Sequence, residues 1–108
     1  MSGPTNEAGL VAAITRAIKK HFPSAWVFKV HGSPVQMAGV PDLLVCHEGR
    51  LLAFEVKFQR PGESREHALS RVSPIQRAQI TALQASGATA LPVLSPEEVL
   101  EVMYQAAA

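Results

Sequence analysis

Two short apolar runs on either side of a glycine turn constrain the fold of this chain more than any other feature. Residues 43–46 and 51–54 are almost wholly apolar, and His47-Glu48-Gly49-Arg50 separates them. Runs of this length around a glycine turn predict a β-hairpin. If Glu48 and Gly49 form the turn, His47 opposes Arg50, and further along the strands Asp42 opposes Glu55.

The hairpin places these two carboxylates on neighbouring strands. Asp42 ends the motif Gly39-Val40-Pro41-Asp42, and Glu55 begins the motif Glu55-Val56-Lys57. Directly opposed Cβ atoms lie roughly 5 Å apart, and Lys57 points to the same side as Glu55 because side chains alternate along a strand. A two- or four-residue turn keeps both acids on one face, whereas a simple three-residue turn separates them.

Two facing carboxylates on nearly apolar strands repel each other and need a compensating cation. Lys57 supplies one positive charge. Hard cations such as Mg²⁺ prefer carboxylate and carbonyl oxygens, and often complete their shell with water and substrate phosphate. Phosphodiester hydrolysis needs such a metal, together with positive charge where the transition state becomes negative. The alternative is an ordinary surface hairpin with scattered charges, and the apolar neighbours on both faces argue against it.

The remaining patterns predict three helices and two further strands. Val11, Ile14 and Ile18 recur at helical spacing and predict a helix over residues 5–21, with Glu7 on the same stripe. Residues 25–31 and 88–94 predict strands. Ser73-Pro74-Ile75-Gln76 carries the signals of a helix start, and a last helix follows residue 95. Residues 58–72 show no clear periodicity, and loops of this length in a compact domain are usually functional or mobile.

This order, αβββαβα, predicts an α/β fold with a mixed four-stranded sheet flanked by helices. Both faces of the hairpin strands are apolar, which indicates a sheet covered on two sides. We therefore expect Trp26 and Phe28 in the core rather than in a base-stacking surface, and Cys46 as a buried structural thiol. A length of 108 residues predicts a single domain over residues 1–108.

Composition narrows the function classes. One cysteine excludes an internal disulfide framework and fits a reducing compartment. No apolar run approaches the ~20 residues of a membrane span, and the N-terminus shows no signal peptide, so we expect a cytoplasmic protein with no membrane partner. The segment from Lys57 to Arg77 contains five basic residues and only two acidic ones. This polarity favours a polyanionic partner over a small-molecule substrate.

Three motifs in this order, Gly39-Val40-Pro41-Asp42, Glu55-Val56-Lys57 and Ser73-Pro74-Ile75-Gln76, resemble the G-x-P-D, E-x-K and S-x-x-Q motifs of the VRR-NUC family. That family belongs to the PD-(D/E)xK nuclease superfamily, which has the restriction-endonuclease-like fold. The resemblance spans residues 7–94. Small standalone members look like Holliday-junction resolvases, and the length of this chain favours that kind. The resemblance thus implies a Mg²⁺- or Mn²⁺-dependent endonuclease that acts as a homodimer on branched DNA.

The same resemblance implies a metal site. Asp42 and Glu55 would bind Mg²⁺ or Mn²⁺ with help from the Val56 carbonyl, and Glu7 would match the acidic residue found in the first helix of many members. Lys57 would orient or help to deprotonate the attacking water. For Glu7 the alternative is a stabilising charge at a helix N-terminus.

The next helix would contribute Gln76, which would hold Lys57 or the attacking water. Its alternative role is that of a capping-box residue. Next to a metal site, basic and strand-end residues become candidate phosphate contacts. These candidates are Arg60, Arg65, Arg71, Arg77 and His31.

Other functions stay open as alternatives. The intact set of Asp42, Glu55 and Lys57 argues against a catalytically silent DNA-binding or scaffold relative. A restriction-type nuclease or an exonuclease on the same fold is a second alternative. A phosphatase or glycosidase is disfavoured by Lys57 and the basic segment after it. The histidines show no spacing with Cys46 that indicates zinc.

Overall fold

A mixed four-stranded sheet organises the fold in a computed structural model that describes residues 3–32 and 37–107. Its strands are β1 (Trp26–Lys29), β2 (Leu43–His47), β3 (Arg50–Val56) and β4 (Thr89–Val93), which lie side by side in chain order. The first three strands run antiparallel to their neighbours, whereas β4 is parallel to β3. The predicted meander and helical crossover are therefore confirmed.

The turn between β2 and β3 consists of Glu48 and Gly49, as predicted. Both residues have positive φ, 52° and 77°, the conformation whose twist matches that of the flanking strands. Glycine adopts it without a steric cost. This turn pairs Leu43 with Phe54, and the same register continued by one residue opposes Asp42 to Glu55.

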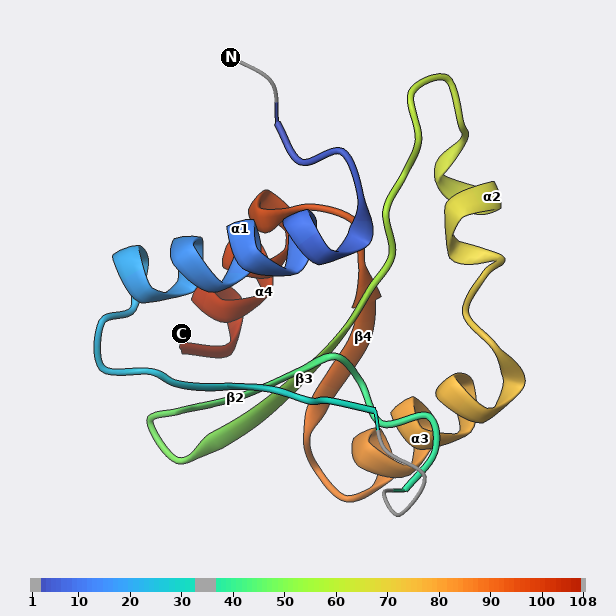
Figure 1. Cartoon of the computed structure of the whole chain (residues 1–108). Coiled ribbons are helices and arrows are strands. Elements are labelled where there is room, and N and C mark those ends of the chain that lie inside the picture. Colours follow the sequence, from blue (N-terminus) through green and yellow to red (C-terminus); the bar gives the residue numbers. More distant parts are fainter. Residues whose placement is uncertain (1–2, 33–36, 108) are drawn as a thin grey trace.

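Four helices flank the sheet within the described residues: α1 (Glu7–His21), α2 (Arg65–Leu69), α3 (Pro74–Ala85) and α4 (Pro96–Ala107). α1 and α4 contact each other on one face of the sheet, and α3 packs against β4 and β3 on the other (Figure 1). The larger core lies under α1 and α4, where Ile14, Ile18 and Phe54 are fully buried. None of these helices is long and apolar enough to cross a membrane.

The segment from Phe58 to Val72 contains a helix that the sequence did not predict. α2 begins after Ser64, whose Oγ accepts a hydrogen bond from the His67 N–H at 3.1 Å. Five residues are too few to show helical periodicity, so the helix rests on its cap and its neighbours. The prediction of a stretch without regular structure is therefore wrong for Arg65–Leu69.

The predicted burial of Trp26, Phe28 and Cys46 is also wrong. Trp26 is 56% exposed and Phe28 is 45% exposed, and Cys46 is exposed as well. All three lie on the same face of the sheet as α3. However, α3 packs over β3 and β4, at the opposite edge of the sheet from β1. The sheet is thus covered more completely on the α1 and α4 side than on the other.

Candidate metal centre

Glu7, Asp42 and Glu55 bring their carboxylates together where α1 begins and β3 ends. One oxygen from each group lies within 4.8 Å of the other two. Glu55 is only 1% exposed, Asp42 is half-buried and Glu7 is exposed. The cluster therefore reaches from the interior of the sheet to the surface, and all of its donors are hard carboxylate oxygens of the kind that Mg²⁺ and Mn²⁺ prefer.

Backbone groups hold Asp42 in place. Its Oδ2 accepts a hydrogen bond from the Val56 N–H at 2.8 Å, and its carbonyl oxygen accepts one from the Val30 N–H at 2.8 Å. These contacts fix Asp42 between the end of β1 and β3.

The residues before Asp42 explain why the motif needs its glycine. Gly39 has a φ of 81°, and a Cβ atom there would lie 2.7 Å from the carbonyl oxygen of Ile75 in α3. No side chain fits this approach. Pro41 is fully buried, so the chain enters β2 in one fixed position against the start of α3.

Burial makes Glu55 a weak acid. Desolvation, followed by the charge of Asp42 and a hydrogen bond with it, raises the pKa of Glu55 to about 8. Lys57 opposes this rise, with its Nζ 3.5 Å from Glu55 Oε2. The single ammonium does not compensate the carboxylates, because the pKa stays high despite it. The site has the electrostatic character of a cation-binding centre.

Lys57 lies beside this centre, whereas the contacts of Gln76 are with the start of α3. The Lys57 side chain is 10% exposed, and its backbone N–H donates to the Val93 carbonyl at 3.0 Å. Gln76 forms the capping box of α3, since its Oε1 accepts from the Ser73 N–H at 2.9 Å. The start of α3 therefore occupies the Gln76 oxygen, and only its Nε2 amide can donate to another group.

Comparison with known proteins identifies the fold. No protein-family model and no curated protein matches the sequence. A solved structure described as a VRR_NUC domain protein is similar with a TM-score of 0.65 and 22% identity, covering 97% of this chain and 89% of that chain. A second, described as a VRR_NUC domain, gives a TM-score of 0.59 and 22% identity, over 86% of this chain and 92% of that chain.

The chain has the VRR_NUC fold. The predicted restriction-endonuclease-like architecture, a mixed four-stranded sheet flanked by helices, is thus confirmed. In this VRR_NUC fold the carboxylates of Asp42 and Glu55 lie at the ends of the central strands, and α1 adds Glu7.

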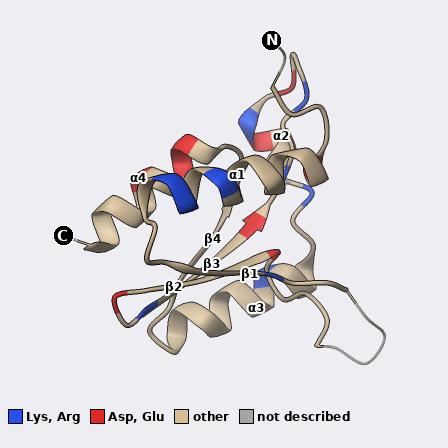
Figure 2. Ribbon diagram, turned by 60° about the vertical axis from the view of Figure 1, so that its left-hand side comes forward, with Lys and Arg blue, Asp and Glu red and all other residues tan. Residues whose placement is uncertain are grey.

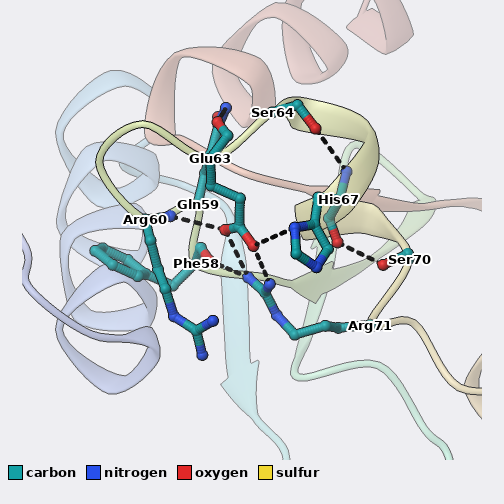
Figure 3. A network of polar contacts seen from close by, with 8 residues as sticks. All are labelled: Phe58, Gln59, Arg60, Glu63, Ser64, His67, Ser70 and Arg71. Atoms are coloured by element: carbon teal, nitrogen blue, oxygen red, sulfur yellow. Dashed lines mark hydrogen bonds and ion pairs between the residues drawn. The ribbon is translucent and has the colours of Figure 1, made fainter.

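Glu63 organises the loop that follows the centre of the VRR_NUC fold (Figure 3). Its carboxylate accepts hydrogen bonds from the Arg60 N–H at 2.9 Å and from the Arg71 guanidinium, and lies 3.5 Å from His67 Nδ1. Arg71 also donates to the Phe58 carbonyl. The Arg71 hydrogen bond, followed by that of Arg60, lowers the pKa of Glu63 to about 2. The loop is thereby tied to the segment after α2.

Two of the predicted DNA-contact residues lie beside the carboxylates. Arg60 and Arg71 line a groove with Glu7. Its other walls are formed by Thr5, Asn6, Phe58 and Pro61. The charge of Glu7 also contributes to raising the pKa of Arg71, after the larger effects of Glu63. The groove therefore joins two guanidinium groups to the exposed end of the carboxylate cluster.

The other predicted contacts are elsewhere. Arg65 Nη1 lies 2.6 Å from Glu98 Oε2 in α4, and this contact raises the pKa of Arg65. Arg77 is exposed on α3, and His31 is exposed beyond the end of β1. The structure brings none of these three to the groove between Glu7 and Arg71.

The role of Glu63 could not be predicted from composition, because in the sequence it is one of two acids in a basic segment. Acidic and basic residues are in fact intermingled around α2 (Figure 2). The four-residue spacing from Glu63 to His67 and the eight-residue spacing to Arg71 were the available signal. Spacing of this kind indicates ion pairs on a helical segment, but only after the helix itself is recognised.

Proposed function

We propose that this chain is a VRR-NUC nuclease, a metal-dependent endodeoxyribonuclease that hydrolyses phosphodiester bonds in branched or structured DNA. The observation that carries the proposal is the buried Glu55 carboxylate beside Asp42, Glu7 and the Lys57 ammonium. Opposed acids in an apolar sheet are unfavourable unless a cation joins them. The three sequence motifs and the likeness of the fold to VRR_NUC domains support the family.

The metal in this proposal is Mg²⁺ or Mn²⁺, held by Asp42, Glu55 and Glu7. When bound, such an ion polarises a phosphoryl oxygen and lowers the pKa of a coordinated water. The Val56 carbonyl is a further ligand, because the N–H and C=O of one strand residue point to the same side, and the Val56 N–H points to Asp42.

The chain's own residues supply the remaining chemistry. Glu55 must release its proton before its carboxylate can hold a cation, so occupancy of the site rises as the pH approaches about 8. Lys57 places a positive charge where the phosphoryl group gains negative charge and orients the attacking water. Gln76 uses its free Nε2 amide to hold that water, while its oxygen caps α3.

The DNA backbone in this proposal follows the groove beside the carboxylates. Arg60 would contact a phosphate there through paired hydrogen bonds of its guanidinium group, and Arg71 would add positive charge beside it. Arg71 keeps its position through Glu63. Arg65 pairs with Glu98 and does not line the groove.

A homodimer is the assembly that suits a branched substrate. One metal site cuts one strand, and a two-fold pair of sites can cut two strands at related positions. The dimer and the branched substrate both follow from the family resemblance and form part of the proposal.

Cleavage of labelled DNA tests the proposal directly. The purified protein is incubated with a four-way junction, a flap and a linear duplex, in Mg²⁺, Mn²⁺ or EDTA. We expect cutting that needs the metal and falls by roughly a hundredfold or more in Asp42→Asn and Lys57→Ala. Glu97→Gln, which changes an exposed carboxyl in α4, should cut as well as the wild type.

The variants separate the roles within the site. Lys57→Ala should still bind DNA in the presence of Mg²⁺, because its ammonium acts on the transition state. Undiminished cutting by Asp42→Asn would remove the carboxylate cluster from the reaction. Junction binding without any cutting would identify the chain as a catalytically silent DNA-binding relative.

A further inference from the structure

Trp26 and Phe28 form an exposed aromatic pair on the edge strand β1. Their ring centroids are 5.8 Å apart and their planes are within 7° of parallel. Trp26 is 56% exposed and Phe28 is 45% exposed. Large apolar rings left in water lose part of the benefit of burial, so a matched pair of them indicates a surface used for binding.

The aromatic pair lies on the same face of the sheet as the carboxylates. Phe28 is paired with Leu44, so the side chains of these two residues share a face. Asp42 lies two residues before Leu44, and alternation along the strand returns it to that face. The residue opposite Asp42 is Val30, one position past the end of β1, and its N–H donates to the Asp42 carbonyl. At about 3.3 Å per residue, Phe28 and Trp26 stand roughly 7 and 13 Å from that position.

The distribution of charge favours the approach of a polyanion over this face. α3, which covers part of this face, carries Arg77, and neither β1 nor α3 contains an Asp or Glu. The acids of the C-terminal segment gather instead on α4, across the sheet (Figure 2). A nucleic acid that places a phosphate at the carboxylates therefore meets the least repulsion on the side where the aromatic pair is exposed.

We propose that the aromatic pair stacks unpaired bases of the strand whose phosphate lies at the carboxylates. This inference rests on the proposed nuclease function and adds the part of the substrate that is recognised. Stacking on aromatic side chains accepts any base, because every base has a π-face. Exposed aromatic residues on a sheet use the same principle when they bind single-stranded RNA. Bases within a duplex are already stacked and paired, so the aromatic pair selects single-stranded segments.

The single tryptophan of the chain makes the proposal measurable without cleavage. Single-stranded oligothymidylate and a blunt duplex of the same length are titrated in EDTA. We expect oligothymidylate to quench the fluorescence of Trp26 and the duplex to leave it nearly unchanged. Trp26→Ala and Phe28→Ala should each weaken single-strand binding by roughly tenfold, as measured by anisotropy of a labelled oligonucleotide.

Tyr104→Ala is the matched control. Tyr104 is 54% exposed but lies on α4, on the other side of the sheet, and its removal should leave single-strand binding unchanged. Circular dichroism and urea denaturation verify that each variant is folded. Phe28→Leu keeps an apolar side chain without an aromatic ring, and it should bind as weakly as Phe28→Ala if stacking is the cause.

Two results would overturn the inference. Unchanged single-strand affinity in both Trp26→Ala and Phe28→Ala would exclude stacking. The second result has two parts. The substitutions would convert a dimer to a monomer, as seen by sedimentation without DNA, and would weaken the binding of single-stranded and duplex DNA equally. That result would make this face a contact between copies of the chain. If the wild type cuts DNA but shows no quenching, only the stacking inference is refuted. If it shows quenching but never cuts, only the proposed nuclease activity is refuted.

Discussion

Replacing Glu55 with glutamine is expected to stabilise the metal-free protein at alkaline pH. In the folded chain the pKa of Glu55 is about 8, and its ordinary value is 4.5. Between these two values the folded protein holds a proton that the unfolded chain has lost. The free energy of unfolding therefore falls as the pH rises through this window, by up to about 1.4 kcal/mol for each pH unit.

Across the whole window the effect is on the order of 4 to 5 kcal/mol, because Glu55 is buried and solvent screens it little. A domain of this size is typically stable by about 5 to 15 kcal/mol. Ionisation of Glu55 without a cation would thus remove a large share of the stability. Glutamine has the shape of the protonated acid and cannot ionise, so the variant should lose none of it.

Urea denaturation in EDTA, followed by circular dichroism, measures this difference at several pH values between 4.5 and 8 and just above. The wild type and Glu55→Gln should have similar stability at the acidic end and diverge as the pH rises. Glu97→Gln, which removes an exposed carboxyl, should follow the wild type. Added Mg²⁺ should restore the wild type at high pH, since a ligand that binds only the folded state stabilises it. Parallel curves for the wild type and Glu55→Gln would refute the reasoning.

Two further predictions concern the DNA path and the approach to the site. Arg60→Ala should reduce the slope of log affinity for DNA against log salt by roughly one phosphate contact. Arg65→Ala should leave this slope unchanged, because Arg65 pairs with Glu98. Equal slopes for both variants would place the DNA elsewhere. Gly49→Ala should lower the free energy of unfolding by about 1 to 2 kcal/mol, for its positive φ alone. Gly39→Ala should lower it by roughly 1 to 3 kcal/mol more, because its Cβ would meet the backbone of α3. Urea denaturation checks this ranking, and a Gly39→Ala variant as stable as Gly49→Ala would contradict it.

Much of the fold follows from local signals in the sequence. The two-residue turn at Glu48 and Gly49 sets the register of the hairpin, and the register opposes Asp42 to Glu55. The capping signal Ser73-Pro74-Ile75-Gln76 marks the start of α3. Each of these features depends on a few neighbouring residues, so one sequence is enough to find them.

Features that depend on contacts between distant segments could not be predicted in the same way. α2 is stabilised by its cap and by the contacts of Glu63 with Arg71, which no periodic pattern announces. Likewise, the close approach of Gly39 to Ile75 becomes visible only when the loop and α3 lie side by side. A glycine in a motif indicates an unusual conformation, but not the neighbour that requires it.

The proposed DNA-binding face has two parts, the carboxylates and the aromatic pair. They differ in why they are not part of an ordinary apolar core. At Asp42 and Glu55 the departure is chemical: two acids interrupt apolar strands, and the conflict is visible in the sequence. At Trp26 and Phe28 the residue types are those of a core, and only the position of α3 over β3 and β4 leaves them exposed. A sheet face needs a helix above it to become a core, and one helix spans about two strands, since strands lie about 4.8 Å apart and a helix is about 10 Å wide. The sequence provides α3 as the only long helix between β3 and β4 within the described residues, so the aromatic side chains of the edge strand β1 stay exposed.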